Sequence, residues 1–147
     1  MSALRYPQLD NIEDIEGYCP GGFHPVSVGD VLAGRYEVLH KLGFGGSSTV
    51  WLARDYYSRE DLGSLVALKT LSAEQSSKPT TEIPDIYILA HVSACLQAVD
   101  HPGRRHLSII NNYFSHTGPN GSHLCLISQF AGGCRVAGGF EQIWQEK

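Results

Sequence analysis

A glycine-rich segment between two strand-like segments is the feature that most constrains the fold of this chain. Residues 36–42 and 49–54 show the two-residue alternation that is typical of β-strands. Residues 43–48, Gly-Phe-Gly-Gly-Ser-Ser, connect them, and the pattern predicts an antiparallel hairpin. Glycine lets backbone N–H groups approach phosphate oxygens because no Cβ blocks the way. Taken alone, the segment is equally compatible with an ordinary hairpin turn.

A third strand-like segment, residues 65–71, contains a Val-Ala-Leu-Lys motif that ends at Lys69. Ala67 and Lys69 are two residues apart and therefore share one face of a strand. A small residue beside an ammonium group suits a purine with its phosphates. The alternative is a solvated lysine on an edge strand. The otherwise apolar segment and the spacing of nineteen residues from Val50 favour phosphate binding.

The remaining pattern predicts one helix followed by two strands. Apolar and small residues recur at helical spacing over 84–99, and His101-Pro102-Gly103 ends the helix. Residues 107–114 and 123–130 have strand character and are separated by the turn Gly118-Pro119-Asn120-Gly121. We expect an α+β fold with about five antiparallel strands and one helix packed on the sheet. Residues 18–34 are expected to form an extended loop, and residues 72–82 to be mobile.

Composition and charge narrow the possible partners and the compartment. The net charge of −4 and the pI near 5.9 argue against nucleic acid or a membrane surface as the main partner. No apolar run approaches the ~18 residues of a membrane span, and the N-terminus lacks the features of a signal peptide. The four cysteines form no C-x-x-C pair, which favours reduced thiols and a cytoplasmic or nuclear location.

The motif Gly-x-Gly-x-x-x-x-Val followed by Val-Ala-Leu-Lys resembles the small lobe of protein kinases. A P-loop would contain Gly-Lys-Ser/Thr, and a Rossmann site would have a helix after the glycine segment. The flanking motifs resemble SR-protein kinases of the fungal type. These motifs are residues 21–26, 29–30, 34–36, 42–45, 48–53, 101–106 and 118–126. The resemblance implies an ATP-binding lobe over 18–132 and leaves a tail over 133–147 unassigned. Residues 1–17 are polar with an acidic cluster, so we expect them to form a flexible arm.

The resemblance also implies which residues bind ATP. Lys69 would hold the α- and β-phosphates, the backbone of 43–48 would cover the phosphates, and 129–131 would form the hinge that reads the adenine edge. Ser128 occupies a position where the family usually has a bulky residue, which implies a roomier back pocket. The implied ATP-binding residues are Leu42, Gly43, Phe44, Gly45, Gly46, Ser47, Ser48, Val50, Ala67, Lys69, Gln129 and Ala131.

The helix partner of Lys69 is open at this point. The family has a glutamate just before an Ile-x-x-Leu motif, and this chain has Asp85 there. Aspartate is shorter by one methylene, so a direct ion pair requires the helix to lie closer to the strand. Glu82 is a possible substitute. Alternatively, Asp85 only favours the helix N-terminus by its charge.

The resemblance implies a transferase that moves the ATP γ-phosphate to serine in Arg/Ser-rich proteins, with Mg²⁺. Kinases need a catalytic-loop aspartate and a second aspartate for Mg²⁺. Asp85 and Asp100 are the only aspartates after Lys69, and neither lies in such a motif. We therefore expect no catalytic residue in these 147 residues, Mg²⁺ binding only in a full-length kinase, and no activity of this chain alone.

Alternatives to a kinase lobe are a non-catalytic module that binds nucleotide or protein, and a poorly folded remnant. A metal site at His91, Cys95, His101 and His106 is a weaker alternative, because no cysteine pair or carboxylate completes it.

Overall fold

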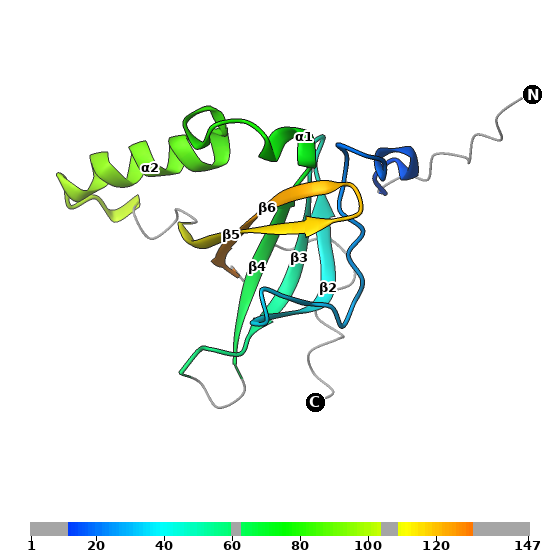
Figure 1. Cartoon of the computed structure of the whole chain (residues 1–147). Coiled ribbons are helices and arrows are strands. Elements are labelled where there is room, and N and C mark those ends of the chain that lie inside the picture. Colours follow the sequence, from blue (N-terminus) through cyan, green and yellow to red (C-terminus); the bar gives the residue numbers. More distant parts are fainter. Residues whose placement is uncertain (1–11, 60–62, 104–108, 131–147) are drawn as a thin grey trace, which may run out of the picture.

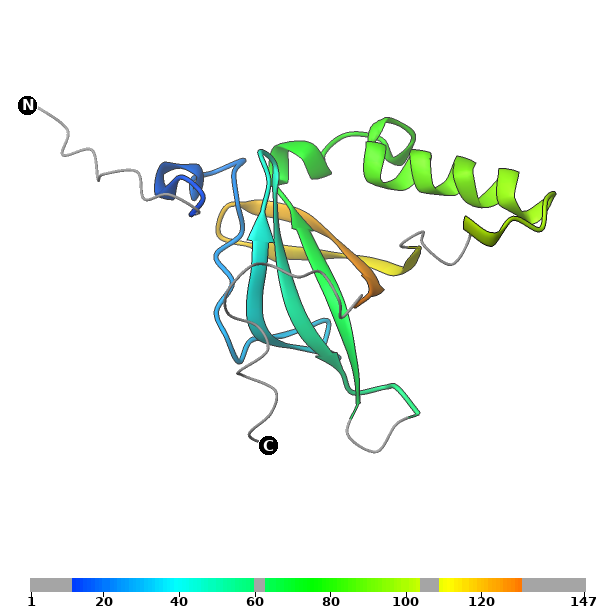
Figure 2. The same cartoon turned by 180° about the vertical axis from the view of Figure 1, so that it is seen from behind.

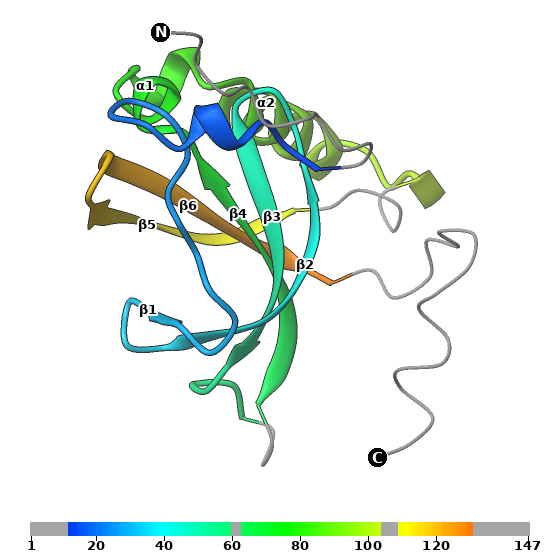
Figure 3. The same ribbon diagram turned by 90° about the vertical axis from the view of Figure 1, so that its right-hand side faces the viewer.

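The computed structural model describes residues 12–59, 63–103 and 109–130, and these residues form one antiparallel sheet (Figure 1). Six strands pair in the order β1-β2-β3-β4-β6-β5. The twist of the sheet is visible in Figure 3. The strands are β1 (Val31–Leu32), β2 (Tyr36–Phe44), β3 (Ser48–Asp55), β4 (Ser64–Leu71), β5 (Ile110–Gly118) and β6 (Gly121–Gln129).

The described helical elements lie at one end of the sheet, and all of them except α2 are a single turn long. The Ser72 side chain accepts a hydrogen bond from the Gln75 N–H and so caps the single-turn helix α1. Pro84 begins α2, where its missing N–H costs nothing. The elements are the 3₁₀ turns η1 (Ile15–Gly17) and η2 (Thr80–Glu82) and the helices α1 (Ala73–Ser76) and α2 (Pro84–Gln97).

The predicted antiparallel sheet with few helices is confirmed, with six strands instead of about five. The additional strand, β1, pairs Val31 with Glu37 and Leu32 with Tyr36. It lies in the segment 18–34, which was expected to be loop, and two residues are too few to show a period in the sequence. Residues 72–82, expected to be mobile, contain α1 and η2.

Helix α2 differs from the expectation that it packs on the sheet. None of its residues is buried, and it projects beyond the strands (Figure 2). The predicted stripe includes Ala90, Ser93 and Ala98, whose small side chains offer little apolar surface to bury. Ile86, near the start of the helix, packs against a cluster of Leu71, Ile83, Leu124 and Leu126.

The expected flexible arm over 1–17 is described only for residues 12–17, and these contact the sheet. Glu13 is buried and pairs with Lys41 of β2. The Tyr18 hydroxyl donates a second hydrogen bond to the same carboxylate. Burial alone would raise the pKa of Glu13, but these two bonds outweigh it and lower the pKa below its ordinary value. The ion pair with Lys41 is long-range, so local polarity did not reveal it.

The lead-in segment, residues 18–30, runs along one face of the sheet from the α1 end to β1 (Figure 3). Val26 of this segment packs against the larger core cluster. Leu68 is fully buried at the centre of this cluster. The cluster consists of Leu32, Tyr36, Val38, Trp51, Ala53, Val66, Leu68 and Ile127.

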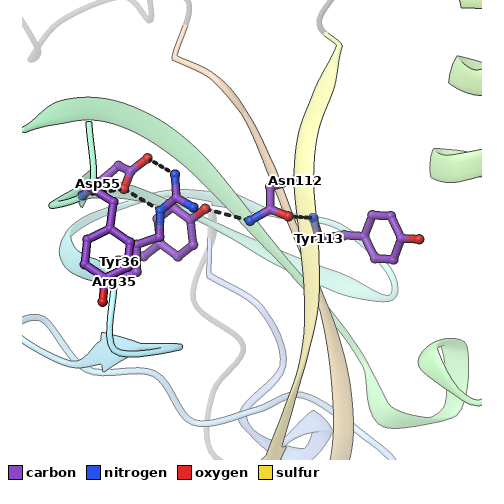
Figure 4. A network of polar contacts seen from close by, with 6 residues as sticks. Arg35, Tyr36, Asp55, Asn112 and Tyr113 are labelled. Carbon is purple, nitrogen blue, oxygen red and sulfur yellow. Dashed lines mark hydrogen bonds and ion pairs between the residues drawn. The ribbon is translucent and has the colours of Figure 1, made fainter. Parts of the chain in front are cut away.

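A polar network fixes the end of the sheet that is remote from α1 (Figure 4). Arg35 donates two hydrogen bonds of 2.6 and 2.7 Å to the Asp55 carboxylate. These bonds lower the pKa of Asp55 below its ordinary value. Nearby, Asn112 of β5 donates to the Tyr36 hydroxyl at 2.9 Å. The four side chains line part of a cavity of about 870 Å³.

Leu68→Ala tests the assignment of the core. The variant removes apolar surface and leaves a cavity, so we expect the free energy of unfolding to fall by about 2–5 kcal/mol. Urea denaturation measures this loss. Val28→Ala, at a side chain that is 66% exposed, should change the same quantity by less than about 0.5 kcal/mol. Equal effects of the two variants would contradict the assignment.

Candidate functional site

The pairing of three strands aligns the predicted phosphate-binding lysine with its expected neighbours. Val50 of β3 lies opposite Lys69 of β4, and Lys69 lies opposite Leu126 of β6. Directly opposed residues in an antiparallel sheet project from the same face. The three side chains therefore form one row across the sheet, with the lysine at its centre.

The next row on this face combines small and apolar side chains. Leu52 of β3 lies opposite Ala67, and Ala67 lies opposite Ser128 of β6. Leu52 is fully buried, whereas Ala67 and Ser128 are half-buried. Two small side chains therefore lie side by side on the face that carries the lysine.

The glycine segment forms the turn between β2 and β3. The Gly45 N–H donates to the Ser48 carbonyl at 2.7 Å, and the Ser72 N–H donates to the Ser47 carbonyl at 2.7 Å. The first bond closes the turn, and the second ties it to the start of α1. Gly43 lies opposite Val50, and a bulge between Lys41 and Gly43 places Leu42 beside that pair. The turn therefore lies next to the Val50–Lys69 row.

Packing and backbone conformation do not require glycine in this turn. A Cβ built on Gly43 or on Gly46 meets no atom within 4 Å. On Gly45 it meets only the Ser48 hydroxyl, at 3.4 Å. None of the three has a positive φ angle. The open space beside these glycines is therefore available to a ligand that approaches the backbone closely.

The structure forms the Lys69–Asp85 ion pair that the sequence left open. The Lys69 ammonium donates to Asp85 Oδ1, and both side chains are partly exposed. Asp85 lies in the first turn of α2, so its charge also suits the helix N-terminus. Glu82, the possible substitute, is exposed and lies in η2. The pair joins α2 to the strand that carries the lysine.

The other predicted site residues differ in position and exposure. Phe44 is 43% exposed at the end of β2, whereas Ser48 is buried at the start of β3. Gln129 ends β6 at an exposed position, beyond Ser128. Ala131 lies outside the described residues. The structure thus gathers Gly43, Val50, Ala67 and Lys69, and puts Gln129 opposite Val66, one residue beyond the Ala67–Ser128 pair.

Leu126 is the neighbour of Lys69 that sequence reasoning missed. It is 2% exposed and completes the row opposite the lysine. The pairing of β4 with β6 joins segments separated by α2 and β5, so no local pattern shows it. The turn that ends at Gly121, whose φ is +132°, fixes only the register of β5 with β6.

Among the described residues, no group of three or more His, Cys, Asp or Glu side chains is arranged to bind a metal ion. His106, one of the residues considered for metal, lies outside those residues. No helix in the described ranges has the length and apolar character needed to cross a membrane.

Comparison with known proteins gives no match to a family model but finds several kinases. The chain is 37% identical to protein kinase dsk1 of Schizosaccharomyces pombe over 121 residues, which cover 82% of this chain and 21% of that kinase. It is 36% identical to human SRSF protein kinase 3 over 122 residues, or 82% and 20% of the two chains. It is 32% identical to a serine/threonine protein kinase of Aspergillus fumigatus over 128 residues, or 84% and 30%.

Over more than four fifths of its length, this chain is related to serine/threonine protein kinases. The relatives include SR-protein kinases, among them SRSF protein kinase 3 and the SRPK of Physarum polycephalum, which is 35% identical over 121 residues. The resemblance to SR-protein kinases indicated by the sequence motifs is therefore confirmed. The chain spans between 20% and 30% of the length of these relatives.

Asp85→Asn tests whether the ion pair holds α2 against the sheet. A partly exposed pair contributes about 0.2–1 kcal/mol, so amide exchange at Ile86 and Tyr87 should accelerate by up to about fivefold. Hydrogen exchange followed by NMR measures this rate. Glu82→Gln is the matched control, because it removes a nearby carboxylate without touching the pair, and it should leave the rates unchanged. Faster exchange in the control alone would identify Glu82 as the partner of Lys69.

Proposed function

We propose that this chain is the ATP-binding small lobe of a serine/threonine protein kinase of the SR-protein kinase type. The glycine turn carries the proposal. At Gly43 and Gly46 the fold itself has room for a Cβ, and neither residue needs a positive φ. The glycines are then explained by close approach of phosphate groups to the backbone of residues 43–48.

The face beside the turn supports the proposal chemically. Lys69 provides a compact positive charge for phosphate oxygens, and Asp85 orients its ammonium group. Val50 and Ala67 provide an apolar surface for a purine on the same face. Backbone groups near Gln129, at the exposed end of β6, would read the adenine edge. Ser128, opposite Ala67, leaves more room behind the purine than a bulky residue would.

The activity of the whole kinase is a second part of the proposal. Relatives named SRSF protein kinase suggest Arg/Ser-rich proteins as substrates and phosphoryl transfer from ATP to serine. Mg²⁺ would neutralise the phosphates in such a kinase. After Lys69, these 147 residues contain no His-Arg-Asp motif and no Asp-x-Gly triplet. The 147-residue chain by itself is therefore expected to bind ATP without transferring phosphate.

Displacement of a fluorescent nucleotide by Mg-ATP tests the proposal on the purified chain. Lys69→Met removes a charge-assisted contact worth about 1.5–3 kcal/mol, so affinity for ATP should fall by about ten- to a hundredfold. Lys78→Met is the control, because Lys78 is also a lysine but is exposed beyond α1. It should bind ATP like the unaltered chain.

Circular dichroism should show that both variants keep the fold. Equal affinities of Lys69→Met and the unaltered chain would contradict the role of Lys69. Absence of binding in a folded, unaltered chain would contradict the proposal and favour a protein-interaction module.

A further inference from the structure

Three histidines from distant parts of the chain are in contact beside the lead-in segment. His24 comes from that segment, His116 from β5 and His123 from β6. The ring centroid of His24 is 4.6 Å from that of His116 and 5.0 Å from that of His123. His24 is 6% exposed and His123 is fully buried. The cluster therefore lies where the lead-in segment contacts the β5–β6 hairpin.

Two buried ring nitrogens in this cluster have no hydrogen-bond partner among the described residues. His123 Nδ1 lies 3.0 Å from the Leu71 carbonyl, which can only accept, so Nδ1 carries the proton and Nε2 is bare in the neutral ring. Among the described residues, buried His123 Nε2 and buried His24 Nδ1 find no hydrogen-bond partner. Protonation at His24 Nδ1 would create a desolvated charge, which is costly.

Hydrogen bonds join the lead-in segment to the β5–β6 turn and to the start of α1. The Gly21 N–H donates to the Asn120 carbonyl at 2.8 Å, and Asn120 Nδ2 donates to the Phe23 carbonyl at 2.7 Å. The Ala73 N–H, at the start of α1, donates to the Gly22 carbonyl at 3.0 Å. The preceding residue, Ser72, bonds to the Ser47 carbonyl of the glycine turn. Displacement of residues 21–24 would therefore loosen α1 and the anchor of the glycine turn.

We propose that His24, His116 and His123 form a proton-operated latch, which holds residues 21–24 against the β5–β6 turn at neutral pH and releases them in mild acid. The ring of His24 packs directly on the backbone of Gly118. A Cβ built on Gly118 would lie only 2.4 Å from His24 Nδ1. This contact leaves no room for the water molecules that would hydrate a charged His24 imidazole. The latch is a property of the lead-in contacts and does not require nucleotide.

Electrostatics set the direction of the response. Burial lowers the pKa of His24 to about 4, repulsion from His116 and His123 adds to this, and Asp30 opposes it. Helix α1, which bonds to the same segment, brings only Glu74, whose side chain is exposed. A released His24 regains an ordinary pKa near 6.5, so between these values the open form binds more protons. The ratio of open to closed forms should then rise about tenfold for each pH unit below 6.5 and level off near pH 4.

Amide hydrogen exchange of the full chain between pH 7.5 and pH 5 tests the latch. Protection factors, which correct for the intrinsic pH dependence of exchange, should fall about tenfold per pH unit below 6.5 at Gly21, Ser72 and Ala73. His24→Gln removes the titrating group and should make these factors independent of pH. His91→Gln is the matched control on exposed α2 and should respond like the unaltered chain.

Several outcomes would overturn the latch. One is a pH response that persists in His24→Gln, and another is constant protection in the unaltered chain down to pH 5. An equal loss of protection at Leu68 would show global unfolding instead of local release.

Because His24→Gln can fail to fold, two further measurements apply. Gly118→Ala should lower protection at Gly21 already at pH 7.5, and an NMR titration of the unaltered chain that gives His24 a pKa of 6.5 or above would refute the proposal.

Discussion

The antiparallel register of β3, β4 and β6 is the constraint on which the core and the candidate site both depend. On one face it aligns Trp51, Leu68 and Ile127 within the larger core cluster. On the other face it aligns Val50, Lys69 and Leu126. A slip of one residue would exchange the two faces, bury the lysine and expose the core. Burial of apolar side chains on one face therefore fixes the position of the lysine on the other.

The elements that attach to this sheet are held with different strength. The lead-in segment is fastened by backbone bonds at Gly21 and by the buried side chain of Phe23. By contrast, α2 has no buried residue and is attached through Ile86 and the Lys69–Asp85 pair. The lysine is thus placed by an inner strand of the sheet, whereas its partner comes from a helix that has no buried residue.

Local patterns predicted most of the fold, and long-range contacts account for what they missed. The strands from β2 to β6 and the helix α2 agree with the periodic segments within a few residues, because alternation and helical spacing are local properties. Strand β1 is too short to have a period. The pairs Glu13–Lys41 and His24–His123 join residues far apart in the sequence, and no motif connects them.

The same distinction applies to the candidate site. The glycine segment and Lys69 were recognisable from spacing, but the choice between Asp85 and Glu82 required the position of α2. Leu126 joins the site only through the pairing of β4 with β6, which the intervening helix and strand conceal from the sequence. Spacing therefore indicated the chemistry of the site, and the sheet supplied its remaining neighbours.

The central claim is that ATP binds on the face that carries Lys69, next to the glycine turn. Hydrogen–deuterium exchange of the chain with and without saturating Mg-ATP locates the nucleotide most directly. The account predicts slower exchange at residues 43–50 and no change around Arg35 and Asn112, which line the cavity at the remote end of the sheet together with Gln129. Slower exchange confined to that cavity, or no change anywhere in a folded chain, would contradict it.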